Sequence, residues 1–159
     1  MATTFKQLLG NSNQTITITG GSLAANGQRS SAAIDDTTGL YSGANLVVYA
    51  QAPASALTAS PVVNIYVYGS ANNGTNYPEG CGTDTSVTLA STTNLISIRP
   101  LNTPVAGTVY YSNPLPISSI FTDGIPSKWG IVLENKASAT IALGATCGAY
   151  FEGMLNQGV

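Results

Sequence analysis

The chain has 159 residues, with 5 Lys or Arg, 7 Asp or Glu and no His, and its formal net charge is −2. Charged residues make up 8% of it, against about 25% in an average globular protein. Its scattered cations exclude the clustered basic surface of a nucleic-acid-binding protein, and it contains neither an apolar run of membrane-spanning length nor a signal-peptide pattern. We therefore expect no nucleic acid and no membrane as partners, and synthesis in the cytoplasm without export by the general secretory route.

Residues 1–14 are expected to form an N-terminal arm that precedes a single domain over residues 15–159. A short helix, the only one in the chain, is expected at 3–10, where a Thr precedes and a Gly follows the apolar residues. The apolar residues of the arm are candidate contacts with a neighbouring protein, on which the arm would become ordered. They are Phe5, Leu8 and Leu9.

From residue 14 onward, apolar and polar residues alternate with a period of two, as in β-strands with one buried face. Turn signals rich in Gly, Asn and Pro separate the alternating runs. The predicted strands are 14–19, 44–52, 62–69, 86–90, 94–101, 107–118, 127–135, 139–143 and 146–155. About eight or nine strands in one domain predict an all-β fold, an antiparallel β-sandwich. A jelly roll is the favoured topology, and an immunoglobulin-like sandwich is the alternative.

The strand predicted at 62–69 has an aliphatic face and a tyrosine face. Because the aliphatic residues are expected in the core, Tyr66 and Tyr68 are expected to point outward, with Tyr49 on the equivalent face of a neighbouring strand. A tyrosine combines a large apolar ring with a hydroxyl that tolerates water, which suits a protein interface. Two other interpretations stay open: the rings pack beneath a loop of the same domain, or they form a platform for sugars. The aliphatic residues are Val63, Ile65 and Val67.

The titratable residues form no recognisable catalytic or metal-binding pattern. General acid–base catalysis needs positioned titratable groups, and a Ser-His-Asp triad cannot be built without His. Asp35 and Asp36 are adjacent, so on a strand they would point to opposite faces, and Glu134 is expected at an exposed position. Cys81 is expected in an exposed loop and Cys147 in the core, and neither belongs to a CxxC pair. We therefore expect no enzyme, no cofactor and no metal site.

Three stretches of the chain resemble small β-rich structural proteins encoded among the virion genes of tailed bacteriophages. They are "SLAANGQRSSAAIDDTTGLYSGANLVVYAQAP" (22–53), "IYVYGSANNGTNYPEG" (65–80) and "SKWGIVLENKASATIALG" (127–144). The resemblance lies in the overall pattern, covers most of the chain beyond the arm, and includes no diagnostic catalytic or ligand motif. It implies a structural component of the particle, in first place a capsid decoration (cement) protein. The turn "SANNGTN" at 70–76 lacks the acidic residues that such proteins often carry there, so a cation at this turn is not expected.

A surface poor in charge and rich in Ser, Thr and Asn agrees with this resemblance, because charges buried between packed subunits cost desolvation free energy. An extracellular-type β-domain often has the same composition. We expect a homo-oligomer, with a trimer favoured, that binds the major capsid protein or other virion proteins and stabilises the shell. Its expected location is the virion, assembled in the host cytoplasm. The alternatives are a neck or tail component of the particle and a glycan-binding module for host attachment.

Overall fold

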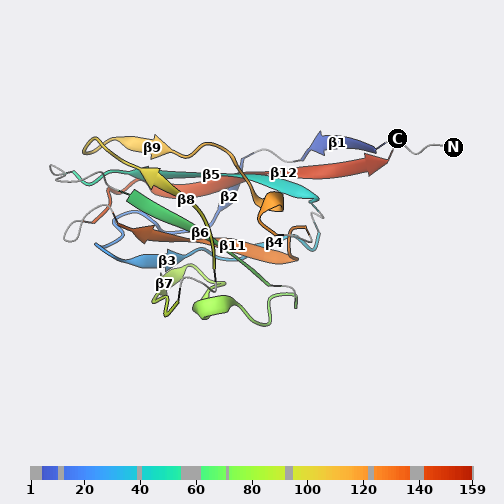
Figure 1. The fold of residues 1–159 in the computed structure, drawn as a ribbon, viewed down its shortest axis with the longest axis horizontal. Helices are drawn as coiled ribbons and strands as arrows, with labels where there is room; N and C mark the ends of the chain where they lie inside the picture. The colour runs from blue at the N-terminus through green and yellow to red at the C-terminus, as the bar shows by residue number, and fades with distance from the viewer. Residues whose placement is uncertain are drawn as a thin grey trace.

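The computed structural model describes residues 5–10, 13–38, 41–54, 62–70, 72–91, 95–121, 124–136 and 142–158. Two antiparallel six-stranded sheets pack face to face around an apolar core (Figure 1), so the predicted all-β sandwich is confirmed. The described residues contain no α-helix, and 3-10 turns occur at Pro78–Gly80 (η1) and Ile117–Ser119 (η3). Within these ranges, no helix has the length and apolar character needed to cross a membrane.

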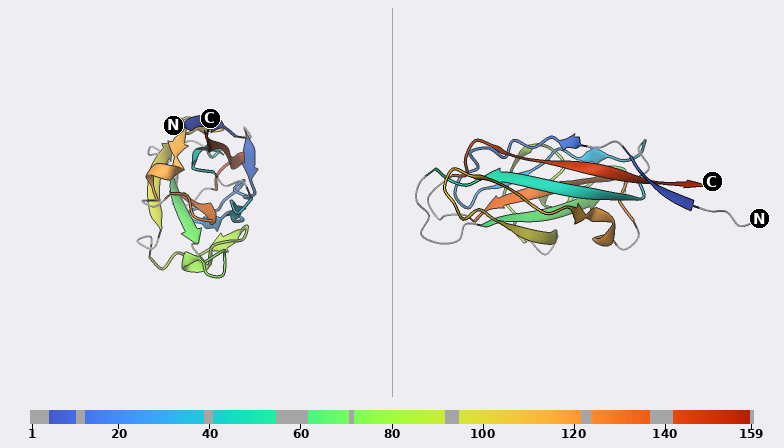
Figure 2. Two further views of the ribbon diagram at one scale, coloured as in Figure 1. Left: turned by 90° about the vertical axis from the view of Figure 1, so that its right-hand side faces the viewer. Right: turned by 90° about the horizontal axis from the view of Figure 1, so that it is seen from above.

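The first sheet, sheet A, is built around two long central strands. Its strands are β1 (Phe5–Leu9), β2 (Gln14–Ile16), β5 (Gly43–Gln51), β9 (Val109–Tyr111), β10 (Leu115–Pro116) and β12 (Cys147–Gly158). Their order is β1-β12-β5-β10, and β2 also pairs with β12 and β9 with β5. β12 continues beyond the start of β5 as a two-stranded ribbon with β1, which projects from one end of the sandwich (Figure 2).

The second sheet, sheet B, has β6 and β11 at its centre. Its strands are β3 (Gln28–Ser30), β4 (Ile34–Asp35), β6 (Val62–Ser70), β7 (Thr85–Val87), β8 (Ile96–Asn102) and β11 (Lys128–Asn135). Their order is β7-β3-β11-β6-β8, and β4 also pairs with β11. β6 and β11 pair along their whole length, from Lys128↔Ser70 to Asn135↔Val63.

The apolar core lies between the two sheets and is formed by alternate residues of the central strands. Trp129 of β11 and Phe151 of β12 meet edge to face across the core, with ring centroids 5.3 Å apart. The aliphatic face of β6 is buried in this core, which confirms the prediction for Val63, Ile65 and Val67. Period-two alternation thus identified the inward side of β6 correctly.

Three expectations about individual elements need correction or fall outside the described residues. The helix expected over 3–10 is wrong for Phe5–Leu9, because this segment pairs with β12 and tertiary pairing overrides local helix signals. β3 and β4 were not predicted, because they are too short to show alternation. Residues 139–141 of the strand expected at 139–143 lie outside the described ranges, and 142–143 are not in a strand. The domain boundary at residue 14 stays a prediction.

Candidate interaction surface

The tyrosine face of β6 points away from the core, as predicted, but it is not exposed. The side chains of Tyr66 and Tyr68 are 7% and 1% exposed. They form a second apolar cluster with Val132 and Cys81, because residues 72–91, here called the covering segment, lie over this side of sheet B (Figure 1). The segment includes the edge strand β7, which pairs with β3. The predicted exposure of both tyrosines is therefore wrong, as is that of Cys81, and both rings pack beneath a loop of the same domain.

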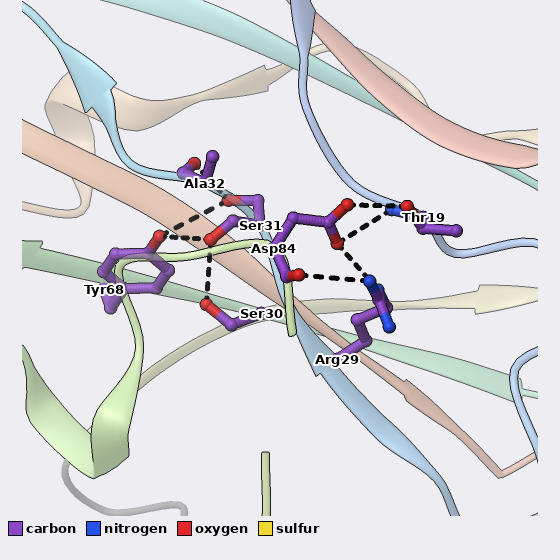
Figure 3. Close-up of polar contacts among 7 residues, drawn as sticks. All are labelled: Thr19, Arg29, Ser30, Ser31, Ala32, Tyr68 and Asp84. Atoms are coloured by element: carbon purple, nitrogen blue, oxygen red, sulfur yellow. Dashed lines mark hydrogen bonds and ion pairs between the residues drawn. The ribbon is translucent and has the colours of Figure 1, made fainter. Parts of the chain in front are cut away.

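An ion pair fastens the covering segment to sheet B (Figure 3). Arg29 Nε donates to Asp84 Oδ1 at 2.7 Å, and Arg29 Nη2 donates to the Asp84 carbonyl oxygen at 3.1 Å. The amide and hydroxyl of Thr19 donate to the same carboxylate at 3.0 and 2.6 Å. Burial alone would raise the pKa of Asp84, but the hydrogen bonds from Arg29 and Thr19 outweigh it and lower the pKa. The carboxylate thus joins three segments that are distant in sequence.

The buried Tyr68 hydroxyl has a backbone partner beneath the covering segment. It donates to the carbonyl oxygen of Ser31 at 2.8 Å (Figure 3). Its ring lies over Gly130 of the paired strand β11, where a Cβ would overlap the phenol. Burial raises the pKa of this hydroxyl, so it stays protonated as a donor. The contacts of Tyr68 are those of a structural residue.

Glu134 was expected to be exposed, but only 4% of it is. Its Oε1 accepts hydrogen bonds from Gln28 Nε2 at 2.8 Å and from Lys136 Nζ at 3.2 Å. Its Oε2 accepts from Asn64 Nδ2 and from the Tyr66 hydroxyl, both at 2.9 Å. Burial alone would raise the pKa of Glu134, but these hydrogen bonds outweigh it and hold the pKa below its ordinary value. The four donors occupy the lone-pair positions of the carboxylate, which is therefore not free to act as a base.

A pocket of ≈ 650 Å³ opens beside this carboxylate and is lined by residues of the loop 19–27, of β3 and of the end of the covering segment, 86–89. The charged residues that line it are Arg29, Glu134 and Lys136. Each already belongs to an ion pair, Arg29 with Asp84 and Lys136 with Glu134. The pocket therefore presents no unpaired charge to a ligand.

The adjacent carboxylates Asp35 and Asp36 have separate surroundings. Asp35 lies 2.7 Å from Lys128 Nζ, and hydrogen bonds from Lys128 and Thr37 lower its pKa strongly. Asp36 is buried, and this burial raises its pKa although it accepts a hydrogen bond from the Tyr41 amide at 3.1 Å. Across the described ranges, no three His, Cys, Asp or Glu side chains gather as ligands for a metal ion.

A different set of tyrosines lies on the outer face of sheet A. Tyr49 of β5 pairs with Tyr111 of β9, and Tyr150 lies on β12 at the other side of β5. The ring of Tyr49 is 5.6 Å from that of Tyr111 and 6.5 Å from that of Tyr150, with interplanar angles of 35° and 38°. Tyr111 is 62% exposed, and the other two are half-buried. We call these three residues the tyrosine strip.

Charge is nearly absent from the sheet that carries the tyrosine strip. β2, β5, β9 and β10 contain no charged residue, β1 contains Lys6 and β12 contains Glu152. The ion pairs found in the described part of the chain all involve residues in or next to sheet B. They are Arg29–Asp84, Lys128–Asp35 and Lys136–Glu134. The ion pairs thus lie on the other side of the sandwich, and the outer face of sheet A carries aromatic and neutral polar groups together with Glu152, two residues along β12 from Tyr150.

Sequence reasoning selected Tyr49 but placed it beside the wrong partners. Tyr66 and Tyr68 lie in sheet B, on the opposite side of the sandwich, so the shared face expected for the three is wrong. Tyr150 was missed, although it lies between the buried Ala149 and Phe151 and a period of two places it outward. The partnership of Tyr49 with Tyr111 depends on the register of β5 and β9, which alternation alone does not determine.

The other candidate contacts, Phe5, Leu8 and Leu9, lie in β1. The structure places their backbone beside Met154–Gly158 of β12. Their side chains fall outside the part of the chain that it describes, so their role as contacts stays a prediction.

Comparisons of the chain with protein-family models, with curated proteins and with solved structures find no match in any of the three.

Proposed function

We propose that this chain is a non-enzymatic structural protein of a tailed-phage virion, which binds the capsid surface as a decoration (cement) protein and stabilises the shell. The tyrosine strip is the observation that carries the proposal. Its rings offer large apolar area together with hydroxyls that tolerate water, the chemistry enriched at the centres of protein interfaces. Covering this face requires almost no charge to be desolvated, and the resemblance of the sequence to phage virion proteins points to the same class of partner.

We also propose that the sandwich is a jelly roll. β1 with β2, β3 with β4, and β9 with β10 each pair with one shared neighbour and count as interrupted single strands. When each of these pairs is counted as one strand and the edge strand β7 is left out, the sandwich has eight strands. Numbered 1 to 8 along the chain, they lie in the order 1-8-3-6 in sheet A and 2-7-4-5 in sheet B. This order, with the first strand beside the last, supports the two Greek keys of a jelly roll, a fold frequent in viral capsid and lectin domains. The fold supports the proposed function only by analogy, and the proposal depends on the tyrosine strip and the surface around it.

The proposed partners are the major capsid protein or other virion proteins, together with further copies of the same chain. A homo-oligomer would make several modest contacts at once, and multivalency raises the overall affinity without any new contact. A protein that binds only the assembled shell shifts the equilibrium toward that shell by mass action. The proposal includes no cofactor, metal, nucleic acid or membrane.

A glycan-binding module for host attachment is the second candidate, because exposed aromatic rings also stack on sugars. Sugar hydroxyls then need polar side chains beside the rings. Gln51 follows Tyr49 on the same face of β5, but its amide is already used: Nε2 donates to the Gly107 carbonyl at 2.9 Å and Oε1 accepts from the Thr146 amide at 3.2 Å. This favours a protein partner over a glycan.

The proposal can be tested with phage particles assembled without this protein, to which the purified chain is added back. Tyr111→Ser should lower the melting temperature only slightly, because the side chain is 62% exposed and loses little more than its ring contact with Tyr49. Loss of an interface anchor costs about 2 kcal/mol or more, so occupancy at limiting protein should fall by at least about tenfold. Val105→Ser is the matched control, since Val105 is 58% exposed but lies in the loop before β9. Equal occupancy for the two variants would contradict the tyrosine strip as the contact.

Particle stability and copy number separate the alternatives. Particles without the protein should release their genome at lower temperature and under milder osmotic shock, and unchanged stability would contradict a cement role. Copies in the hundreds would fit decoration, whereas about a dozen or fewer would fit a neck or tail ring of closed cyclic symmetry. Binding of the purified chain to a glycan array, lost in Tyr111→Ser, would favour host attachment instead.

A further inference from the structure

The ribbon formed by β1 and the end of β12 has two open edges. β12 pairs with β5 only as far as Met154↔Gly43, whereas its pairing with β1 continues to Phe5↔Gly158. Over residues 155–158, β12 therefore has β1 on one side and no described strand on the other. β1 is the last strand of its sheet in the described chain, so its outer edge is open too. Figures 1 and 2 show this ribbon projecting from the body of the sandwich.

The hydrogen bonds of the ladder identify the backbone groups at the open edge of β12. Successive residues of an antiparallel strand bond alternately to one neighbour and the other. Gln51 N donates to the Thr146 carbonyl at 2.7 Å, which assigns the even-numbered residues of β12 to the β5 side. Where β5 is absent, the N–H and C=O groups of Asn156 and Gly158 therefore face the open edge.

The same argument applies to the outer edge of β1. Gly10 N donates to the Gly153 carbonyl at 2.7 Å, in register with the pairing of β1 and β12. Alternation then directs the even-numbered residues of β1 toward β12. The backbone groups of the odd-numbered residues, with Gln7 at the centre of the strand, face outward.

Apart from Lys6, the two edges lack the features by which proteins protect exposed strands. Natural edge strands are blunted by charged residues, proline or a bulge. β1 reads FKQLL and β12 ends in LNQG, so Lys6 is the single charged residue and proline is absent. The pairing of the two strands is continuous in register. A two-stranded ribbon is at best marginally stable alone, so both edges are suited to a further strand.

We infer that the two edges pair with each other between copies of this chain, and that three copies close into a ring. Identical ribbons placed side by side around an axis bring the outer edge of β1 against the open edge of β12 of the next copy. These strands are antiparallel, because β1 and β12 are antiparallel within each ribbon. A head-to-tail contact of this kind closes into a ring when its rotation allows, and full closure removes every edge.

The number of strands sets the smallest number of copies. Two ribbons supply four strands, too few to close, since the small barrels of known folds have about five or more. Three ribbons, with six strands, form the smallest ring that closes. This inference rests on the homo-oligomer included in the proposed function and does not depend on the virion as partner. It names the partner of the ribbon as a second and a third copy of this chain.

The test measures the mass of the purified full chain by light scattering, with no particle present. Wild type should have the mass of three chains. Gln7→Pro removes the outward donor of β1, and Asn156→Pro removes that of β12, while the donors that join the two strands remain. Each proline variant should shift to the mass of one chain, whereas Gln7→Ala and Asn156→Ala, which keep the backbone N–H, should stay at three. A thermal unfolding transition like that of wild type shows that the sandwich is intact in each variant.

Covalent trapping covers the case in which a proline variant fails to fold. Gln7→Cys chains coexpressed with Asn156→Cys chains should form a disulfide-linked pair on oxidation, because the two positions lie on edges that would meet between copies. Neither single variant alone should form a disulfide-linked dimer, and neither should wild type with its own two cysteines.

Several outcomes overturn the inference. The inference is wrong if wild type is a monomer or has a mass other than that of three chains. It is also wrong if only one of the two proline variants loses assembly, or if Gln7→Cys alone forms a disulfide-linked dimer, which requires a two-fold contact. A trimer that is absent from phage particles would contradict the proposed function and leave the ribbon contact standing. A monomer that still binds particles would contradict the ribbon contact and leave the proposed function standing.

Discussion

The ring of Tyr49 lies across Gly148 of the neighbouring strand, where a Cβ would come within 2.6 Å of the tyrosine hydroxyl oxygen. The two residues are directly opposite in the pairing of β5 with β12. Sheet B contains the same relationship, since Tyr68 lies over Gly130 of β11. In each sheet a glycine lets an outward tyrosine lie close to the backbone of the next strand. In sheet A, this sets the position of the middle ring of the tyrosine strip.

Gly148→Ala should therefore destabilise the fold through Tyr49. Inserting a methyl group into a filled space costs about 1–3 kcal/mol, measured here as the free energy of unfolding in urea. When Tyr49 is also replaced by Ala, the clash is gone, and the alanine at 148 should cost less than about 0.5 kcal/mol, since Ala is preferred to Gly in a strand. The double-mutant cycle isolates this coupling. An equal cost of Gly148→Ala in both backgrounds would show that the ring does not depend on the glycine.

The two buried tyrosines of β6 should differ in the cost of losing the hydroxyl. Tyr66 donates to a carboxylate oxygen of Glu134, and Tyr68 donates to a backbone carbonyl. Hydrogen bonds to charged groups contribute about 1.5–3 kcal/mol and neutral ones about 0.5–1.5 kcal/mol. Tyr66→Phe should therefore lower the free energy of unfolding more than Tyr68→Phe, and each variant is the control for the other. The reverse order would contradict the contacts described for Glu134.

β6 shows which features of a strand can be predicted from the sequence alone and which cannot. Its alternation correctly separates Val63, Ile65 and Val67 from the tyrosines, because a period of two is a local property. Whether the tyrosines are exposed depends on the covering segment, which Asp84 holds through residues 55 and 65 positions away in sequence. Local patterns contain no information on such contacts. The burial of Glu134 has the same cause, since its partners come from β3, from β6 and from Lys136.

The N-terminal strand shows the opposite failure, in which local signals mislead. Residues 3–10 combine a cap, good helix formers and a glycine stop. Phe5–Leu9 is nevertheless a strand, because β12 extends far enough to offer it a complete ladder. Pairing across more than 140 positions overrode the preference of the segment. In the tyrosine strip, Tyr150 could have been predicted from its buried neighbours, whereas the contact of Tyr49 with Tyr111 required the register.

The covering segment should open when its ion pair is removed. Asp84→Ala takes the acceptor from Arg29 and Thr19 and leaves the part-buried guanidinium unpaired. Chymotrypsin should then cleave after Tyr77 or Leu89 faster, by about tenfold for each 1.4 kcal/mol by which opening becomes easier. Asp35→Ala is the matched control, because it removes an ion pair whose carboxylate is more exposed and lies outside the segment. Equal cleavage in both variants would show that Asp84 does not hold the segment closed.

Glu134 should make the fold sensitive to acid. Hydrogen bonds hold its pKa in the folded chain below the ordinary value of a glutamate carboxyl, so the folded state binds its proton less readily than the unfolded state does. A carboxyl group of this kind contributes its full stabilisation above its unfolded pKa, and the contribution is lost as the pH falls through the folded pKa. In Glu134→Gln the side chain does not titrate in this pH range, and its amide NH2 faces the hydrogen-bond donors that surround the carboxylate in wild type. We therefore expect the free energy of unfolding at pH 7 to fall by about 1.5–3 kcal/mol. Below about pH 4.5, the variant should lose less further stability than wild type. Urea unfolding at pH 7, 5, 4 and 3 measures both effects.

Some acid sensitivity should remain in the variant, because Asp35 and Asp84 also have lowered pKa values. Parallel curves for the two proteins would mean that Glu134 does not contribute to the acid response.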